Sequence, residues 1–154
     1  MPGPIETRLT ELGVTLSDPP PPAASYVPFV QVGSMVFVSG QISGTPTDPI
    51  SGKLGADMDV AAGAKAARFC AVSLLAQVRA AAGGDIERLK RVVKLTGFVN
   101  STPDFTQQPL VINGASDFLV EALGDAGRHS RSAVSAASLP FGVAVEIEGI
   151  FELS

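Results

Sequence analysis

Residues 143–153 read Val-Ala-Val-Glu-Ile-Glu-Gly-Ile-Phe-Glu-Leu, and apolar and polar side chains alternate along most of this stretch. Alternation with a period of two is typical of a β-strand that has one face against a core. The odd positions from 143 to 151 are apolar or glycine, whereas three even positions carry carboxylates: Glu146, Glu148 and Glu152. We therefore predict a strand whose odd face lies under helices and whose even face meets water or a partner that supplies cations.

The segments before this strand alternate between strand-like and helix-like patterns. Runs that favour strands occupy four further segments: 29–32 and 35–41, both within residues 26–42, then 92–99 and 130–136. Helical spacing covers two segments: 60–82, with Asp59 as its N-cap, and 106–123, with Pro109 near its beginning. The order ββ-α-β-α-ββ predicts an α+β fold in which one mixed sheet carries two helices on one face.

Short connections predict a hairpin at each end of this order. Gly33-Ser34 suits a two-residue turn between the first two strands. Leu139-Pro140-Phe141-Gly142 would join the last two strands, 130–136 and 143–153. Residues 43–55 are rich in glycine, proline and threonine and read as a long loop.

Residues 1–22 are interpreted as an N-terminal arm, separate from a single domain that spans residues 23–154. Ile5, Leu9 and Leu12 have the spacing of one helical face, and Gly13 would end that helix. The run Pro19–Pro22 reads as a stiff spacer, because proline cannot join a helix or donate to a sheet. We expect the arm to lie over the domain, outside its core.

Composition narrows the classes of function. Hydrophobic residues make up 45% of the 154 residues and charged residues only 17%, which is little charge for a soluble monomer and predicts that subunits cover part of the surface. A net charge of -4 and no Trp argue against nucleic-acid partners. One Cys and one His exclude an intrachain disulfide and a Cys/His zinc site. With no apolar run of membrane-spanning length and no signal pattern, the chain is expected to be cytoplasmic and away from membranes.

Arg131 and Glu146 are the candidate chemical groups of the last two strands. If their hairpin register pairs odd residues of one strand with even residues of the other, both side chains face the same space. Two interpretations remain open. The pair is a structural ion pair, or Arg131 clamps a small carboxylate through its planar fork while Glu146 holds a water or moves a proton.

Three motifs resemble the C-terminal block of the Rid (YjgF, reactive-intermediate deaminase) family, which also carries the label endoribonuclease L-PSP. They are Arg131-Ser132-Ala133-Val134, Leu139-Pro140 and Val145-Glu146-Ile147-Glu148-Gly149-Ile150. Tyr26, the stretch Val38-Ser39-Gly40-Gln41-Ile42 and Phe98-Val99 match in order, so the resemblance covers residues 26–151 of a longer, divergent member. It implies a chorismate-mutase-like fold and a homotrimer with sites between subunits. It also implies hydrolysis of enamines and imines, such as 2-aminoacrylate, to 2-keto acids and ammonia without a metal or organic cofactor.

Carried over by position, the resemblance implies a role for each site residue. Arg131 would bind the substrate carboxylate, and Glu146 would position the attacking water and assist proton transfer. Tyr26, Ser39 and Asn113 would line the cleft. Ala133 occupies a site position that is often Cys in the family, so any role for a thiol there is absent. The alternative is a non-catalytic trimer that binds a small carboxylate such as a 2-keto acid, and composition disfavours the ribonuclease label.

Two further residues attract attention as reactive groups. His129 lies in a glycine-containing segment before a strand and is expected to be a solvent-facing loop residue rather than a base. Cys70 lies in an apolar helical stripe and is expected to be a buried, inert thiol.

Overall fold

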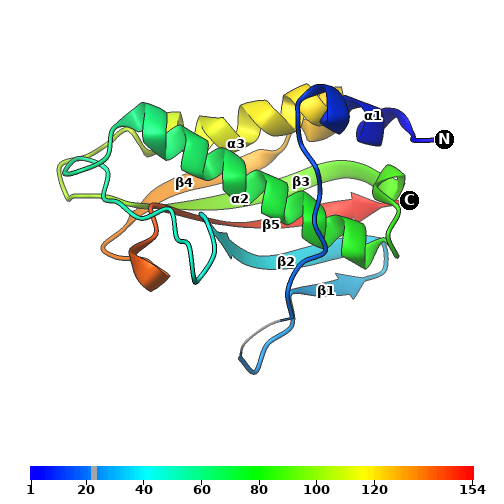
Figure 1. Ribbon diagram of the computed structural model, residues 1–154, viewed down its shortest axis with the longest axis horizontal. Coiled ribbons are helices and arrows are strands. Elements are labelled where there is room, and N and C mark those ends of the chain that lie inside the picture. The colour runs from blue at the N-terminus through cyan, green and yellow to red at the C-terminus, as the bar shows by residue number, and fades with distance from the viewer. Residues whose placement is uncertain (22–23) are drawn as a thin grey trace.

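The computed structural model describes residues 1–21 and 24–154 and contains one five-stranded sheet. The elements in chain order are α1 (Pro4–Glu11), β1 (Phe29–Val32), β2 (Met35–Ile42), α2 (Val60–Ala81), η1 (Ile86–Arg88), β3 (Leu89–Asn100), α3 (Gln108–Leu123), η2 (Gly124–Gly127), β4 (Ser130–Ala136), η3 (Pro140–Gly142) and β5 (Val145–Leu153) (Figure 1). Pro22 and the boundary between the predicted arm and the predicted domain lie outside the described residues.

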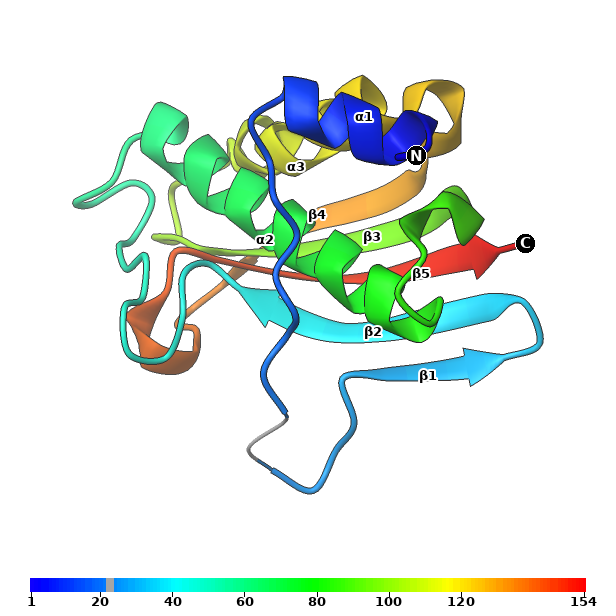
Figure 2. The same cartoon turned by 45° about the vertical axis from the view of Figure 1, so that its right-hand side comes forward.

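The sheet has the strand order β1-β2-β5-β3-β4, and only the pair β3–β4 is parallel. Helices α2 and α3 lie side by side on one face of it, with α1 above α3 (Figure 2). The predicted mixed sheet with two helices on one face is therefore confirmed. The opposite face of the sheet has no helix of the described chain over it in either view and is called the open face below.

The predicted hairpin at the C-terminal end is wrong. The first hairpin forms as expected, with Val32 opposite Met35, but β5 pairs with β2 and β3 and so lies between them. β4 is an edge strand beside β3. The physical reason is burial: Val145, Ile147 and Phe151 of β5 are fully buried, which requires strands on both sides and helices above, whereas the outward residues of β4 tolerate an edge.

Small residues let the two long helices approach closely. The side chain of Asp59 accepts a hydrogen bond from the Ala62 amide at 2.8 Å and begins α2 as predicted. Where α2 meets α3, a Cβ placed on Gly114 would overlap the backbone of Ala64, so no larger residue fits there. Cys70 is fully buried, which confirms that part of its prediction, and burial raises the pKa of its thiol well above the usual range.

The N-terminal arm contributes to the core. Leu9 and Leu16 are 3% and 9% exposed and belong to the same buried cluster as the sheet and the helices, so the expectation that the arm stays outside the core is wrong for these two residues. The arm is also tied to α3, since Arg8 Nε donates to the Glu121 carbonyl at 2.9 Å.

Helix α1 takes its N-terminal cap from a distant part of the chain. The Glu87 carboxylate accepts hydrogen bonds from the Ile5 and Glu6 amides at 3.0 and 2.9 Å, while the N-cap residue Gly3 supplies no side chain. An acceptor at this end satisfies amides that have no partner within the helix, and its negative charge suits the helix dipole.

We expect Glu87→Ala to lower the free energy of unfolding by about 1 kcal/mol, since losing a cap costs this much. Thermal and urea unfolding measure the change. Glu87→Gln, which keeps one carbonyl acceptor, should lose less than Glu87→Ala. Equal stability of Glu87→Ala and the unchanged protein would show that the cap does not anchor the arm.

Candidate functional site

Arg131 lies on the helix side of the sheet, at its β4 edge. It pairs with Leu95 of β3, which is fully buried under the helices, so the two side chains share a face. Arg131 Nη1 donates to Ser116 Oγ at 3.0 Å and Nη2 donates to the Pro109 carbonyl at 3.2 Å, both on α3. The first and third turns of α3 therefore hold the guanidinium in a half-buried position.

The charge of Arg131 is not neutralised by an acid. Within the described residues no carboxylate oxygen lies within 4.0 Å of its guanidinium, and its two hydrogen-bond partners are uncharged. A guanidinium has more N–H donors than these two bonds use. Charges that are partly shielded from water are usually paired, so a cation in this state suits an anionic ligand.

Asn113 and Ala133 lie close to Arg131 in the fold. Asn113 is one turn from both Pro109 and Ser116 on α3, so it belongs to the stripe of the helix that faces Arg131. Ala133 follows Arg131 on the same face of β4 and packs partly against the core. We call Asn113, Arg131 and Ala133 the helix-side group.

Glu146 lies on the open face of the sheet. It pairs with Phe98 on β3 and with Ile42 on β2, and it is half-buried. Burial, with a smaller contribution from the negative charge of Glu148, raises the pKa of Glu146 above its usual value of 4.5. A Cβ on Gly40 would come within 2.5 Å of Glu146 Oε2, so the glycine leaves the space that the carboxylate occupies.

Ser39 lies on β2 next to Gly40, which borders this carboxylate, and Tyr26 lies in the segment before β1. A bulge interrupts the β2–β5 pairing between Val38 and Gln41, and Ser39 stands inside it, next to Gly40. Ser39 Oγ donates to the Val27 carbonyl at 2.9 Å, which ties β2 to the residue that follows Tyr26. Tyr26 itself is 56% exposed. We call Tyr26, Ser39 and Glu146 the open-side group.

The expected meeting of Arg131 and Glu146 does not occur within one protomer. β3 lies between their strands, and Arg131 is level with Leu95 and Gly149, whose face is covered by helices. Glu146 is level with Phe98, on the opposite face. The parity argument is wrong because it assumed a β4–β5 hairpin. The helix-side group and Glu146 with Ser39 instead lie on opposite sides of the sheet, and Tyr26 precedes Val27, which accepts the hydrogen bond from Ser39.

Sequence reasoning missed the contact between His129 and Ser116. His129 Nε2 lies 2.9 Å from Ser116 Oγ, and its Nδ1 lies 2.6 Å from the Gly127 carbonyl. The ring is half-buried, so the expectation of a solvent-facing residue is wrong. Burial lowers the pKa of His129 below 6.5, Arg131 lowers it further, and the Gly127 carbonyl opposes both. The one signal in the sequence was helical spacing, since Ser116 lies three residues after Asn113.

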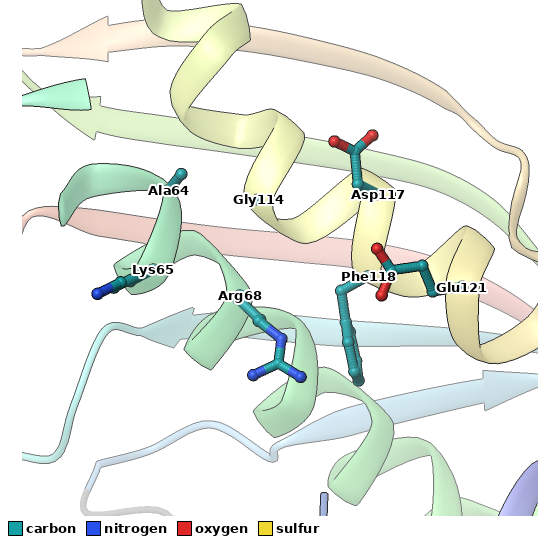
Figure 3. Close-up of a pocket in the computed structure, with 7 residues that line it drawn as sticks. All are labelled: Ala64, Lys65, Arg68, Gly114, Asp117, Phe118 and Glu121. Carbon is teal, nitrogen blue, oxygen red and sulfur yellow. The ribbon is translucent and has the colours of Figure 1, made fainter. Parts of the chain in front are cut away.

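A groove between α2 and α3 lies on the outer side of the helices and contains neither group (Figure 3). Its volume is about 240 Å³, and the Arg68 guanidinium carbon lies 5.0 Å from the centre of the Phe118 ring, which supports a cation–π contact. Residues 1–21 and 24–154 hold no cluster of three or more His, Cys, Asp or Glu side chains arranged for a metal ion. Nor does any helix in that part of the chain have the length and apolar character needed to cross a membrane.

Comparisons with known proteins agree with this architecture. Residues 6–150 match the family model described as "YjgF/chorismate_mutase-like, putative endoribonuclease". Protein TCP17 of Trypanosoma cruzi is 45% identical over 99% of this chain and 96% of its own length. The crystal structure of Atu1372, a protein of unknown function from Agrobacterium tumefaciens, is 50% identical with a TM-score of 0.89, covering 97% of this chain and 92% of that one.

A third relative is Escherichia coli TdcF, whose crystal structure contains bound serine. It is 31% identical with a TM-score of 0.60, and the match covers 89% of this chain and 94% of that one. The family match spans both groups of candidate site residues and most of the N-terminal arm. With this match and these relatives, the resemblance found in the sequence is confirmed, and the chain belongs to the YjgF/chorismate-mutase-like family.

Proposed function

We propose that the protein is an imine hydrolase that converts 2-imino acids, and the enamines in equilibrium with them such as 2-aminoacrylate, to 2-keto acids and ammonia. The observation that carries the proposal is the half-buried guanidinium of Arg131, which is held by uncharged acceptors and has no acidic partner among the described residues. Such a group can bind the carboxylate of a small substrate through two charge-assisted hydrogen bonds.

A second copy of the chain completes the site in this proposal. The helix-side group binds the anion and the open-side group supplies the acid, and they lie on opposite sides of one sheet. Only a neighbouring copy can bring one group against the other. The open face also has exposed apolar side chains that need cover: Val30, Val32, Phe37 and Val134. A homotrimer with closed symmetry would cover these apolar side chains. It would also form three clefts between copies, each with the helix-side group of one copy and the open-side group of another.

The proposed reaction needs one water and one acid–base group. With the carboxylate on Arg131, Glu146 takes a proton from a water whose oxygen attacks the carbon of the protonated imine, and a neutral tetrahedral amino alcohol forms. Glu146 returns that proton to the nitrogen and the C–N bond breaks. Ammonia leaves as the hydroxyl gives its proton to Glu146 and the C=O bond forms, and this last proton then passes to water. A carboxyl whose pKa is raised toward neutrality is suited to these proton transfers.

TdcF supports a carboxylate-bearing ligand for this family, since serine is bound in its crystal structure. The alternative function is a trimer that binds a 2-keto acid without catalysis. One observation favours this alternative: the helix-side group alone can hold a carboxylate, and it contains neither Glu146 nor a thiol, because Ala133 stands where the family often has Cys.

Keto-acid formation from freshly generated 2-aminoacrylate tests the proposal. We expect the purified protein, kept free of added metal, to accelerate the release of pyruvate in a coupled assay by orders of magnitude over buffer. A protein that binds pyruvate in calorimetry but leaves the rate of release unchanged would establish the non-catalytic alternative instead.

A further inference from the structure

Arg131, Ser116 and His129 form a chain of hydrogen bonds with a defined direction. Because the Gly127 carbonyl can only accept, His129 Nδ1, at 2.6 Å from it, carries a proton. In a neutral ring Nε2 is then an acceptor, so the Ser116 hydroxyl donates to it at 2.9 Å. The lone pairs of Ser116 Oγ are left to accept from Arg131 Nη1 at 3.0 Å. Each donor in the chain meets one acceptor.

This chain limits the orientations that the guanidinium can adopt. An arginine side chain on an edge strand has many rotamers, and restricting them when a ligand binds costs conformational entropy. A side chain that is already restricted avoids this cost at the binding step. The Pro109 carbonyl and Ser116 Oγ accept from two different nitrogens of the same planar group. Both acceptors lie on one face of α3, about two turns apart. With its proton directed to His129, the Ser116 hydroxyl leaves its lone pairs free, and one of them accepts from Arg131.

Protonation of His129 would reverse part of the chain. Nε2 would then donate to Ser116 Oγ, which would accept from two cations at once, and the second positive charge would lie beside the guanidinium and repel it. The charged groups on the elements packed around the ring are few and mostly exposed: Arg131 on β4, Arg128 and Asp125 on the preceding segment, Asp117 on α3, and Arg91 and Lys94 on β3. Arg128 and Asp125 pair with each other at 3.6 Å. Burial, and to a smaller extent Arg131, lower the pKa of His129 against the opposing Gly127 carbonyl, which favours the neutral ring.

We propose that Ser116 and His129 are positioning residues for Arg131, and that they hold its guanidinium ready for the substrate carboxylate. The proposal rests on the proposed function, and it adds that carboxylate binding weakens when His129 gains a proton. Neither residue touches the substrate.

Variants at Ser116 test the hydrogen-bond chain through its effect on carboxylate binding. We expect Ser116→Ala to weaken the binding of pyruvate, a stable product-like carboxylate, by about tenfold, since one hydrogen bond to a charged group is lost. In turnover the change should appear in KM, with kcat nearly unchanged. Alanine favours helix, so α3 is retained. Ser116→Thr keeps the hydroxyl and should restore binding. Ser34→Ala is the matched control, because this exposed serine lies in the β1–β2 turn at the opposite edge of the sheet.

The pH dependence separates positioning from a merely structural role. We expect pyruvate binding by the unchanged protein to weaken as the pH falls through the lowered pKa of His129. In His129→Gln, which keeps an acceptor for Ser116 but cannot gain a charge, that part of the loss should disappear. Because the chain has a single histidine, the imidazole signals in an NMR spectrum belong to His129 and its titration can be followed without further assignment. We expect the midpoint of its titration to rise in Arg131→Gln, because the neighbouring positive charge is removed.

The outcomes distinguish the two proposals. If the protein hydrolyses imines and Ser116→Ala binds pyruvate as well as the unchanged protein does, the positioning role is refuted and the proposed function stands. If the protein neither binds pyruvate nor hydrolyses imines, the proposed function fails. In that case the NMR titration of His129 tests the hydrogen-bond chain independently. A midpoint equal to that of a free histidine, or one that does not change in Arg131→Gln, refutes the chain.

Discussion

Arg131→Ala should abolish ammonia release from 2-iminopropionate. Two charge-assisted hydrogen bonds to a sheltered carboxylate contribute about 1.5–3 kcal/mol each, so kcat/KM should fall by about 10²–10⁴-fold. The coupled keto-acid assay measures this fall. The assembly and the fold should persist by light scattering and thermal unfolding, because Arg131 contacts only uncharged acceptors at the β4 edge.

Two variants control this result. Arg131→Lys keeps the charge but not the planar fork, so it should recover only part of the activity. Arg128→Ala removes a neighbouring exposed arginine, whose side chain pairs with Asp125, and should leave the rate unchanged. If Arg131→Ala releases ammonia as fast as the unchanged protein, no carboxylate clamp exists at this position.

Glu146→Gln should remove catalysis and stabilise the fold. Loss of one general acid–base group costs about 10²–10⁴-fold in kcat. The pKa of Glu146 is raised in the folded state, so its stability contribution is present below the unfolded value near 4.5 and is lost as the pH rises through the folded value. Glutamine cannot ionise and avoids that loss. The melting temperature of Glu146→Gln should therefore exceed that of the unchanged protein at pH 7, and the difference should shrink toward pH 4.

Mixing the two inactive variants tests whether the site is shared. In one protomer Arg131 and Glu146 lie on opposite faces of the sheet, so each cleft of the proposed trimer takes them from different copies. Randomly mixed Arg131→Ala and Glu146→Gln subunits should regain both groups in about one quarter of the clefts, because each donor is intact half of the time. Recovery near that level supports a shared site, whereas no recovery after subunit exchange contradicts it.

Local patterns in the chain were enough to predict most elements and the family. The alternation in residues 143–153 identified a half-buried strand, and Asp59 marked the beginning of α2. Such features depend on neighbours a few residues apart, where backbone geometry alone sets which side chains share a face. The motifs around Arg131, Leu139-Pro140 and Glu146 depend on order and spacing, so the family was also readable from the chain.

Contacts between distant segments were decided only by the folded chain. The insertion of β3 between β4 and β5 put Arg131 and Glu146 on opposite faces, and no local pattern carries the order of strands in a sheet. The same holds for the chain from Gly127 through His129 and Ser116 to Arg131, which joins α3 to the segment before β4. Strand order and such contacts follow from burying the apolar face of β5 under the helices at the centre of the sheet. The strand order depends on the packing of the entire core, so it cannot be derived from any single segment of the sequence.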